Sequence, residues 1–445
     1  MNDVIREPAR DVPVVADVDV CVLGGSCTGV FAAVRAARRG ARVALVERQN
    51  AFGGVATGGL VNVWHSLHDT EFRTRIISGL TEETLGRLRR RDALIERPDN
   101  PSSAYVLNTE ELKIELDGLV LEHDVQAFLH TAYCAAHLAG DRLEAVFVEN
   151  KSGRGAIRAR VFVDATGDGD LAAHAGVPFA VAEHLQPPTT CAKVLHFPGS
   201  GFRELYNAHR TEFGLEEDSG WQGPIPGLPG LIMVAQTHVF GANCADACEL
   251  TAAEIEGRRQ IRAIMDLLRQ HGDSKDLALA GLPSYIGIRE TRRFHTDHVL
   301  TENEVLHGVR FPDAVANGSY RVDVHHPSGG GFLFKYLDGT QVDYCNGGQR
   351  VTGRWRPETP ENPTFYQIPY RTMTSARCPN LILAGRMIGT DRGAFGATRV
   401  MVNLNQVGEA AGEAAHLALA RDGRVRDIAP AALRHALADG GSEVR

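Results

Sequence analysis

The sequence predicts an α/β protein with a doubly wound parallel sheet and a second, α+β domain inserted into it. Two observations predict this fold class. The chain opens on a β-α-β unit, with a β-branched run at Val18–Leu23, a glycine-rich turn, a helix and a second strand at Arg42–Val46. A Gly- and Pro-rich middle, about 187–364, separates this unit from a late strand at Leu381–Ala384. Parallel strands joined by a helix must be covered on both faces, which favours a doubly wound sheet.

The composition is that of a globular protein. Hydrophobic residues make up 43% of the 445 residues, which is enough for a large core. The 55 acidic residues outnumber the 47 basic ones, giving a net charge of −8 and no field to attract a phosphate backbone. No stretch approaches the roughly 18 apolar residues of a membrane helix, and the N-terminus lacks a signal-peptide pattern. We therefore expect a cytoplasmic protein without nucleic-acid or membrane partners.

The first helix is expected over Val30–Arg39, where alanines line one side and Gly40 follows in a position that glycine favours after a helix. The strand Arg42–Val46 then delivers Glu47. Further along, strands are expected at Val125–His130, Leu143–Glu149 and Ala156–Val163, a long helix at Leu250–His271, a glycine-broken loop at Gly385–Gly396 and a last helix at Ala397–Arg421.

These elements divide the chain into a discontinuous nucleotide-binding domain and additions to it. We expect the nucleotide-binding domain to comprise 17–66, 123–186 and 365–423, interrupted by a helical excursion at 67–122 and an inserted substrate or cap domain at 187–364. Residues 1–16 and 424–445 are expected to be terminal extensions.

The turn after the first strand carries the first functional motif. Gly24-Gly25-Ser26-Cys27-Thr28-Gly29 departs from the GxGxxG pattern, because Ser26 replaces the second glycine. The turn nevertheless lies between a strand and a helix, whose N-terminus offers N–H groups to a pyrophosphate. Glu47 stands 47 − 29 = 18 residues after the last glycine, where an acid can bind ribose hydroxyls. The pattern predicts a dinucleotide site.

Three further segments favour FAD over NAD. Phe52–Gly59 has almost no side-chain bulk, so a planar ring can approach its backbone. Asp164–Asp170 follows a strand where the pyrophosphate side of a dinucleotide would lie. Gly393–Thr398 leads into the last helix, whose positive end would face the ring and stabilise its reduced, anionic form.

Together with Ile286–Leu300 and Leu381–Gly412, these segments resemble the FAD-dependent oxidoreductase family of the glutathione-reductase-like superfamily, which has a Rossmann-type FAD-binding domain. The resemblance implies FAD as the cofactor and the inserted domain as the substrate side. It places residues on the pyrophosphate, the adenosine and the flavin. The implied cofactor-binding residues are Gly24, Ser26, Cys27, Thr28, Gly29, Glu47, Arg48, Gly53, Gly54, Thr57, Tyr133, Ala165, Thr166, Gly167, Gly385, Arg386, Gly396, Ala397 and Thr398.

Two motifs of the related disulfide reductases are absent from the sequence: a second strand-GxGxxG-helix unit for NAD(P)H and a CxxC pair. We therefore expect electrons to pass directly between the flavin and an organic substrate, and then to an acceptor that the sequence does not identify. The histidines show no HxH or HExxH spacing, so no metal is expected.

A flavin supplies the redox chemistry, so the protein needs groups that orient the substrate and move a proton. His65 and His68 follow the flavin-side loop and are candidate bases, although either can equally satisfy a buried loop. Arg289 and Arg292 are candidates for clamping a substrate carboxylate, with internal pairing to Glu290 as the alternative. His326 in the insert and Arg392 before the last helix complete the catalytic candidates.

The sequence thus favours an enzyme that dehydrogenates or oxidises a small polar molecule at a carbon bearing O–H or N–H, by hydride transfer to flavin. Two alternatives stay open. One is a flavin-dependent C=C reductase or desaturase. The other is a redox-silent flavoprotein with a structural or RNA-related role. The sequence does not identify the oligomeric state.

Overall fold

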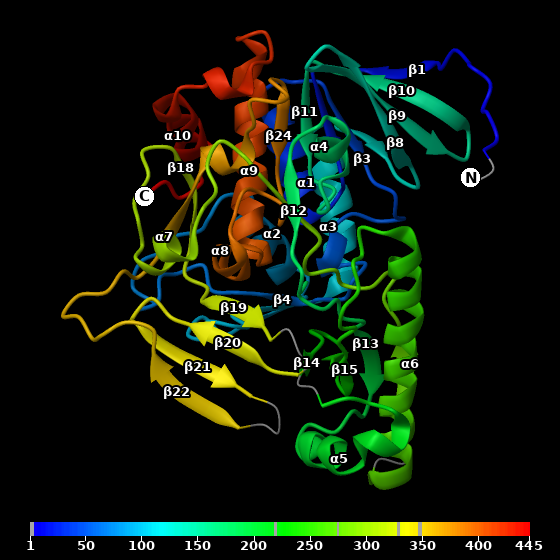
Figure 1. Ribbon diagram of the computed structural model, residues 1–445, viewed down its shortest axis with the longest axis vertical. Helices are drawn as coiled ribbons and strands as arrows, with labels where there is room; N and C mark the ends of the chain where they lie inside the picture. Colours follow the sequence, from blue (N-terminus) through cyan, green and yellow to red (C-terminus); the bar gives the residue numbers. More distant parts are fainter. Residues whose placement is uncertain (1–3, 218–219, 274–275, 327–329, 346–348) are drawn as a thin grey trace.

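The computed structural model describes residues 4–217, 220–273, 276–326, 330–345 and 349–445 (Figure 1). At its centre lies a five-stranded parallel sheet in the order β24-β11-β2-β3-β7. Every residue of four of its strands, β24, β11, β2 and β3, is buried, as the short apolar runs of the sequence require. The strands are β2 (Val20–Leu23), β3 (Val43–Val46), β7 (Gln126–Phe128), β11 (Val161–Asp164) and β24 (Leu381–Leu383). The predicted α/β fold class is confirmed.

Two helices far apart in sequence pack against one another and the parallel sheet: α1 (Cys27–Arg38) and α9 (Met401–Leu419). Glycines permit their close approach. A Cβ at Gly408 would overlap the carbonyl oxygen of Thr28, and one at Gly412 would overlap that of Ala32. Of the alanines predicted to line one side of the first helix, Ala32, Ala33 and Ala36 are buried there and Ala37 is partly buried. This contact fixes the last helix of the domain beside the first glycine-rich turn.

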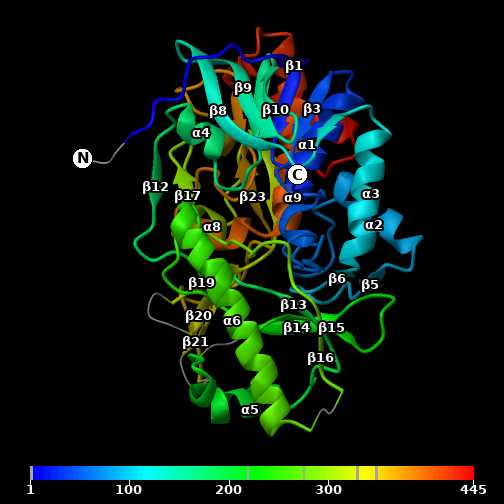
Figure 2. The same ribbon diagram turned by 90° about the vertical axis from the view of Figure 1, so that its right-hand side faces the viewer.

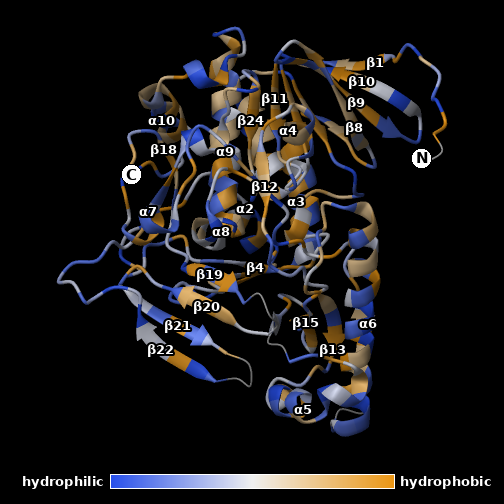
Figure 3. Cartoon of the chain, viewed as in Figure 1, coloured by the Kyte–Doolittle hydropathy of each residue, from blue (hydrophilic) through white to orange (hydrophobic). Residues whose placement is uncertain are grey.

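A second sheet lies beside the parallel one, in the order β1-β10-β9-β8. This sheet contributes Val146, Val148 and Ile157 to the hydrophobic core that the parallel strands form. Figure 3 shows the parallel strands in the colour of hydrophobic residues. The predicted single strand Ala156–Val163 is in fact two strands of different sheets, because Arg160 and Val161 turn to pair with Asp19 between them. The strands are β1 (Val14–Asp17), β8 (Ala132–Ala139), β9 (Arg142–Asn150) and β10 (Gly153–Arg158).

The middle of the chain forms two further sheets below the parallel one in Figure 1. The first has the strand order β14-β15-β13-β16. Its Val194 and Val234 pack against Ile261 and Leu268 of the long helix α6. This helix crosses the front of Figure 2. The second is the meander β19-β20-β21-β22. Their elements are β13 (Ala192–Leu195), β14 (Trp221–Pro224), β15 (Leu231–Ala235), β16 (Ala278–Gly281), α5 (Phe202–His209), α6 (Ala247–His271), β19 (Val322–His325), β20 (Phe332–Lys335), β21 (Thr340–Tyr344) and β22 (Arg350–Arg354).

The remaining elements connect these layers. The segment 67–122 is helical as expected, with two helices, and it also holds two strands that form a small sheet with β4 in the order β4-β6-β5. The C-terminal residues are tied to α1, because Arg35 donates to the carbonyl of Gly440. The elements are β4 (Val63–Trp64), α2 (Leu80–Arg89), β5 (Leu94–Glu96), β6 (Tyr105–Leu107), α3 (Thr109–Leu121), α4 (Asp170–His174), β12 (Phe179–Val181), β17 (Arg292–Phe294), α7 (Glu302–Leu306), β18 (Ala314–Gly318), β23 (Tyr366–Pro369), α8 (Arg392–Thr398) and α10 (Pro430–Asp439).

Within the described ranges, every helix falls short of the length and apolar character that crossing a bilayer requires.

Candidate cofactor and substrate site

A cavity of about 620 Å³ opens where β2, β11 and β24 end. It continues between the parallel sheet and the sheets formed by the middle of the chain. Ligands of open α/β sheets bind at the carboxyl ends of the strands, so this is the expected place for a dinucleotide. The predicted cofactor residues that line it are Gly24, Ser26, Cys27, Thr28, Glu47, Arg48, Gly53, Gly54, Ala165, Thr166, Gly167, Gly385 and Arg386.

The turn before α1 is built by close backbone packing. Gly24 has a φ of 96°, and a Cβ there would overlap the carbonyl of Ala165 in the neighbouring turn. Ser26 is the N-cap of α1, and its hydroxyl accepts from the N–H of Gly29 at 3.4 Å. The N–H of Gly53 donates to the carbonyl of Gly25 at 2.8 Å, which holds the second glycine loop against the first. The two loops therefore form one surface with little side-chain bulk.

Glu47 ends β3 and is almost fully buried at the cavity wall. One carboxylate oxygen accepts from the N–H of Gly25 at 2.6 Å, and the other accepts from the N–H of Gln49 at 2.8 Å. The carboxylate thus fixes the first glycine turn, a role that the spacing alone did not reveal. Each oxygen keeps a further lone pair for a ligand hydroxyl.

The turn after β11 is held by another buried acid. Asp164 accepts from the backbone N–H and the hydroxyl of Thr166 and from the N–H of Ala172. Burial raises the pKa of this carboxyl to about 6, against the opposing effect of these hydrogen bonds. Close by, Arg386 pairs with Asp168, and its guanidinium lies over Gly167, where a Cβ would strike it. A cation therefore stands over the second glycine turn of the cavity.

The helix expected to begin at Ala397 is two helices. α8 ends at Thr398, Val400 is extended, and α9 begins at Met401. The cause lies in the side chains around Ala397, because its carbonyl accepts from the Tyr366 hydroxyl at 2.8 Å and from Asn403 at 3.2 Å. The carbonyl is thereby satisfied outside a continuous helix. The cavity consequently meets the start of α9, at Val400, Met401, Leu404 and Asn405.

Asn405 is a site residue that the sequence did not single out. It lines the cavity one turn into α9 and is fully buried, yet among the described residues neither its amide nitrogen nor its amide oxygen has a hydrogen-bond partner. A buried amide left without partners costs about 1–3 kcal/mol, so a polar ligand group at this place would stabilise it. The pyrimidine edge of a flavin alternates N–H and C=O groups and matches an amide in this position. The glycine surface and this amide both fit FAD.

The family described as FAD dependent oxidoreductase matches residues 19–437 of the chain. The chain belongs to this family. FAD is accordingly the cofactor, and the enzyme is an FAD-dependent oxidoreductase. A comparison with curated protein sequences gives no match.

Solved structures of flavoproteins resemble this family member at low identity. A geranylgeranyl bacteriochlorophyll reductase-like protein from Thermoplasma acidophilum is 12% identical, with a TM-score of 0.49 over 96% of this chain and 84% of that one. The p-nitrophenol 4-monooxygenase of Pseudomonas putida is also 12% identical, with a TM-score of 0.43 over 95% of this chain and 84% of the other. A flavin-dependent brominase gives 12% and 0.45 over 95% and 84% of the two chains.

The other predicted cofactor residues of this family member support the cavity from outside its lining. Gly29 packs against the carbonyl of Gly24, and the Thr57 hydroxyl donates to the carbonyl of Phe52 at 2.6 Å. The hydroxyl of Tyr133 lies 2.8 Å from Nδ1 of His174. Gly396 lets α8 pack on the backbone of Asp323 in β19. Ala397 and Thr398 are buried inside α8. At this end of the cavity the lining residues are therefore Val400, Met401, Leu404 and Asn405, in place of the expected Ala397 and Thr398.

Among the catalytic candidates, the structure brings His65 and Arg289 to the cavity. The other four lie outside its lining. The backbone carbonyl of His68 accepts from the Ser319 hydroxyl, and Arg292 pairs with Asp170 at 2.9 Å. His326 contacts Asp343 at 2.7 Å, and Arg392 donates to the carbonyl of His325 at 3.2 Å. None of these four lines the cavity, so we no longer place them in the site.

The pair His325-His326 shows why one histidine reaches the cavity and the next does not. Successive side chains of a strand point to opposite faces, and His325 is the last residue of β19. His325 lines the cavity, and its ring centroid lies 5.0 Å from that of His238, another lining residue. Burial and the charge of Arg289 hold the pKa of His325 well below its ordinary value. The imidazole of His325 is therefore neutral at physiological pH.

His65 follows β4 and meets the edge of Tyr320, with ring centroids 4.3 Å apart at 63°. Within the described residues, neither ring nitrogen forms a hydrogen bond, and Nδ1 is buried. Burial and the nearby charges of Arg321 and Arg399 lower the pKa of this imidazole to about 3, while Asp323 opposes the shift. His65 is thus a neutral imidazole that can accept a hydrogen bond.

The opposite wall comes from the β19–β20–β21 meander, which sequence reasoning treated only as part of an insert. Phe332 and Phe334 alternate along β20 on one face, and Tyr344 stands opposite Phe332 on β21. All three line the cavity, with Arg321, Asp323 and Arg399 beside them. The period-2 pattern of Phe332-Leu333-Phe334 was the one local signal that could have pointed to this wall.

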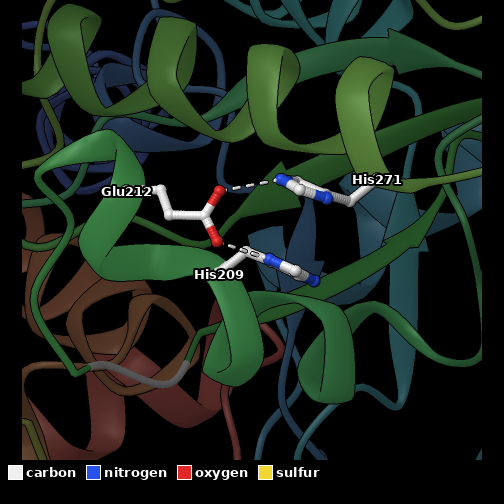
Figure 4. Close-up of side chains that lie close together, drawn as sticks. All are labelled: His209, Glu212 and His271. Carbon is white, nitrogen blue, oxygen red and sulfur yellow. Dashed lines mark hydrogen bonds and ion pairs between the residues drawn. The ribbon is translucent and has the colours of Figure 1, made fainter.

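A separate cluster of ligand-type side chains lies away from this cavity, on α5, η2 (Arg210–Phe213) and α6 (Figure 4). Glu212 contacts Nδ1 of His209 at 2.7 Å and Nε2 of His271 at 3.0 Å. The two imidazoles are stacked, with centroids 3.6 Å apart and planes 10° apart. Nitrogen lone pairs in parallel ring planes do not converge on one ion, so we interpret this cluster as a hydrogen-bonded link between α5 and α6.

Proposed function

We propose that the enzyme dehydrogenates a small polar molecule at a carbon bearing O–H or N–H, with His65 as the acceptor of the substrate proton. Bound FAD would accept the hydride. The proposal assigns the space between the start of α9 and the wall of β19–β21 to the substrate, with residues 187–364 supplying most of that side. The proposal specifies which reaction this FAD-dependent oxidoreductase catalyses, and it depends on one observation at His65.

That observation is a neutral imidazole at the cavity with no hydrogen-bond partner among the described residues. A substrate O–H or N–H can donate to it on binding. As the hydride leaves the carbon, the remaining O–H or N–H becomes strongly acidic, so even a weak base takes its proton. The carbon–oxygen or carbon–nitrogen bond becomes a double bond. The negative charge of Asp323, which opposes the lowering of the His65 pKa, would stabilise the developing imidazolium. Well-placed proton transfer of this kind contributes about 10²–10⁴-fold in rate.

The test is anaerobic flavin bleaching with a panel of alcohols, hydroxy acids and amines. We expect one class to reduce the flavin of the parent enzyme, and the His65→Asn variant to be slower by about 10²-fold or more at unchanged FAD content. His137→Asn, at an exposed histidine of β8, is the matched control. If reduced enzyme is reoxidised by an enone or enoate and no alcohol or amine bleaches it, the direction of the reaction is the reverse. Equal rates for His65→Asn and parent would remove His65 from the chemistry.

A further inference from the structure

We propose that the substrate carries a carboxylate on a small planar ring, and that Arg321 binds this carboxylate. The inference rests on the proposed function in one respect, because it takes the part of the cavity around His65 as the substrate side. It adds the substrate class and a specificity-determining residue.

Arg321 brings a positive charge to the cavity that the protein leaves without an acidic partner. Among the described residues, no carboxylate oxygen lies within 4.0 Å of its guanidinium. In the part of the chain that the structure describes, its hydrogen bond to the protein runs from a terminal nitrogen to the Ser102 hydroxyl at 2.8 Å, and its buried Nε has no partner there. A guanidinium offers five donors, so most of the donors of Arg321 remain for a ligand.

Two charged side chains close to Arg321 are already paired with each other. Arg399 contacts Asp323 at 3.1 Å, and the Tyr320 hydroxyl also donates to Asp323 at 2.8 Å. Asp323 is therefore occupied by two donors and forms no ion pair with Arg321, although its charge helps to raise the pKa of the Arg321 guanidinium against the effect of burial. At the other end of the cavity, Arg386 pairs with Asp168. Arg321 thus keeps a charge that no described carboxylate pairs with, and an anion is the ligand group that would complete this end of the site.

The surroundings of Arg321 favour a flat ligand. Its guanidinium lies 3.9 Å from the ring centroid of Phe334 and 4.8 Å from that of Tyr320, which fixes the plane of the fork. Phe332 continues this wall, with its centroid 4.7 Å from those of both Phe334 and Tyr344. A fixed planar fork beside aromatic faces matches a carboxylate attached to a ring that stacks on them.

Binding of the carboxylate would also act on the proposed base. The positive charge of Arg321 is one of the groups that hold the pKa of His65 low, with Arg399 adding to it and Asp323 opposing it. A bound anion would offset the charge of Arg321 and raise the pKa of His65 toward its ordinary value. The correct substrate would thereby improve the base that deprotonates it.

The test measures ligand binding to the oxidised holoenzyme by flavin difference absorbance, with benzoate, benzamide and cyclohexanecarboxylate as probes. We expect benzoate to bind tightest, because benzamide lacks the charge and cyclohexanecarboxylate lacks the flat ring. The Arg321→Gln variant should raise the Kd of benzoate about 10-fold or more and leave that of benzamide unchanged. Arg321→Lys, which keeps the charge without the fork, should fall between parent and Arg321→Gln.

The matched control is Arg350→Gln, at an exposed arginine of β22 in the same sheet. FAD content and thermal melting verify that each variant is folded. Benzamide binding as tightly as benzoate to the parent enzyme would overturn the proposal, as would an unchanged benzoate Kd in a folded Arg321 variant. Because this assay needs no turnover, an Arg321-dependent benzoate site in an enzyme that no alcohol or amine reduces would uphold the anion site and refute the proposed reaction.

Discussion

The carboxylate of Glu47 accepts a hydrogen bond from the backbone N–H of Gly25, at 2.6 Å, across the end of the β-α-β unit. The acid therefore organises the glycine turn of α1 in addition to facing the cavity. A second hydrogen bond, from the N–H of Gln49 at 2.8 Å, holds its other oxygen. Losing the charge on Glu47 should thus disturb both the turn and the ligand contact.

We predict that Glu47→Gln weakens FAD binding by about 10-fold or more. The amide keeps the shape of the side chain, but its NH₂ group faces one of the two backbone N–H donors, and hydrogen bonds to a charged acceptor are worth about 1.5–3 kcal/mol each. Titration of the apoprotein with FAD, followed by flavin fluorescence, measures the effect. Glu144→Gln, at a half-exposed acid of β9, should leave the affinity unchanged. Identical affinities for the two variants would mean that Glu47 does not organise the site.

Asn405→Leu should have opposite effects on the apoprotein and the holoenzyme. Removing a buried amide that has no partner in the protein should stabilise the apoprotein by about 1–3 kcal/mol, while FAD loses a hydrogen-bonding group and binds more weakly. Asn403→Leu should instead destabilise the apoprotein, because Asn403 donates to the Tyr366 hydroxyl at 2.9 Å. Urea unfolding and FAD titration of both variants separate the two roles. Destabilised apoprotein in Asn405→Leu would contradict the assignment.

Gly408→Ala should destabilise the protein by about 1–3 kcal/mol, because the new methyl group overlaps the carbonyl of Thr28 and pushes α9 from α1. FAD affinity should fall as well, since Thr28 lines the cavity. Gly86→Ala in α2 is the control. Its Cβ would meet nothing closer than the tip of Arg90 at 3.9 Å, so it should stabilise the helix by about 0.5–1 kcal/mol. Chemical denaturation measures the free energy of unfolding of both variants. Equal stabilities would refute the close packing of α1 and α9.

The free energy of unfolding should fall as pH drops below about 6.5. The pKa of His65 is about 3 in the folded protein and near 6.5 in the unfolded chain, so between these values the unfolded chain binds a proton that the folded protein does not. Each such histidine costs up to about 1.4 kcal/mol per pH unit, and His325 shifts in the same direction. The raised pKa of Asp164 works the other way, stabilising the fold as pH falls from about 6 toward 3.8. Urea unfolding of His65→Asn between pH 7.5 and 5 should show a shallower loss than that of the parent, and parallel curves would exclude this contribution.

The parts of the site encoded by local sequence could be predicted, and the parts that depend on distant partners could not. The turn at Gly24–Gly29 and Glu47 belong to one β-α-β unit, so spacing alone located them at the cavity. Arg292 and Arg321 look alike as isolated arginines. One is neutralised by Asp170, 122 residues earlier, and the other has no acidic partner among the described residues. The break before α9 likewise depends on Tyr366, 31 residues before the carbonyl it binds.

The cavity lining extends along the chain from Gly24 to Asn405, and α9 must dock on α1 before the lining is complete. During synthesis, α1 emerges from the ribosome long before α9 is made. The nascent chain therefore has a phosphate-binding turn without the amide and helix start that complete the cavity. We therefore expect FAD binding to require α9, so that a polypeptide truncated before residue 400 would be colourless even though its first β-α-β unit is intact.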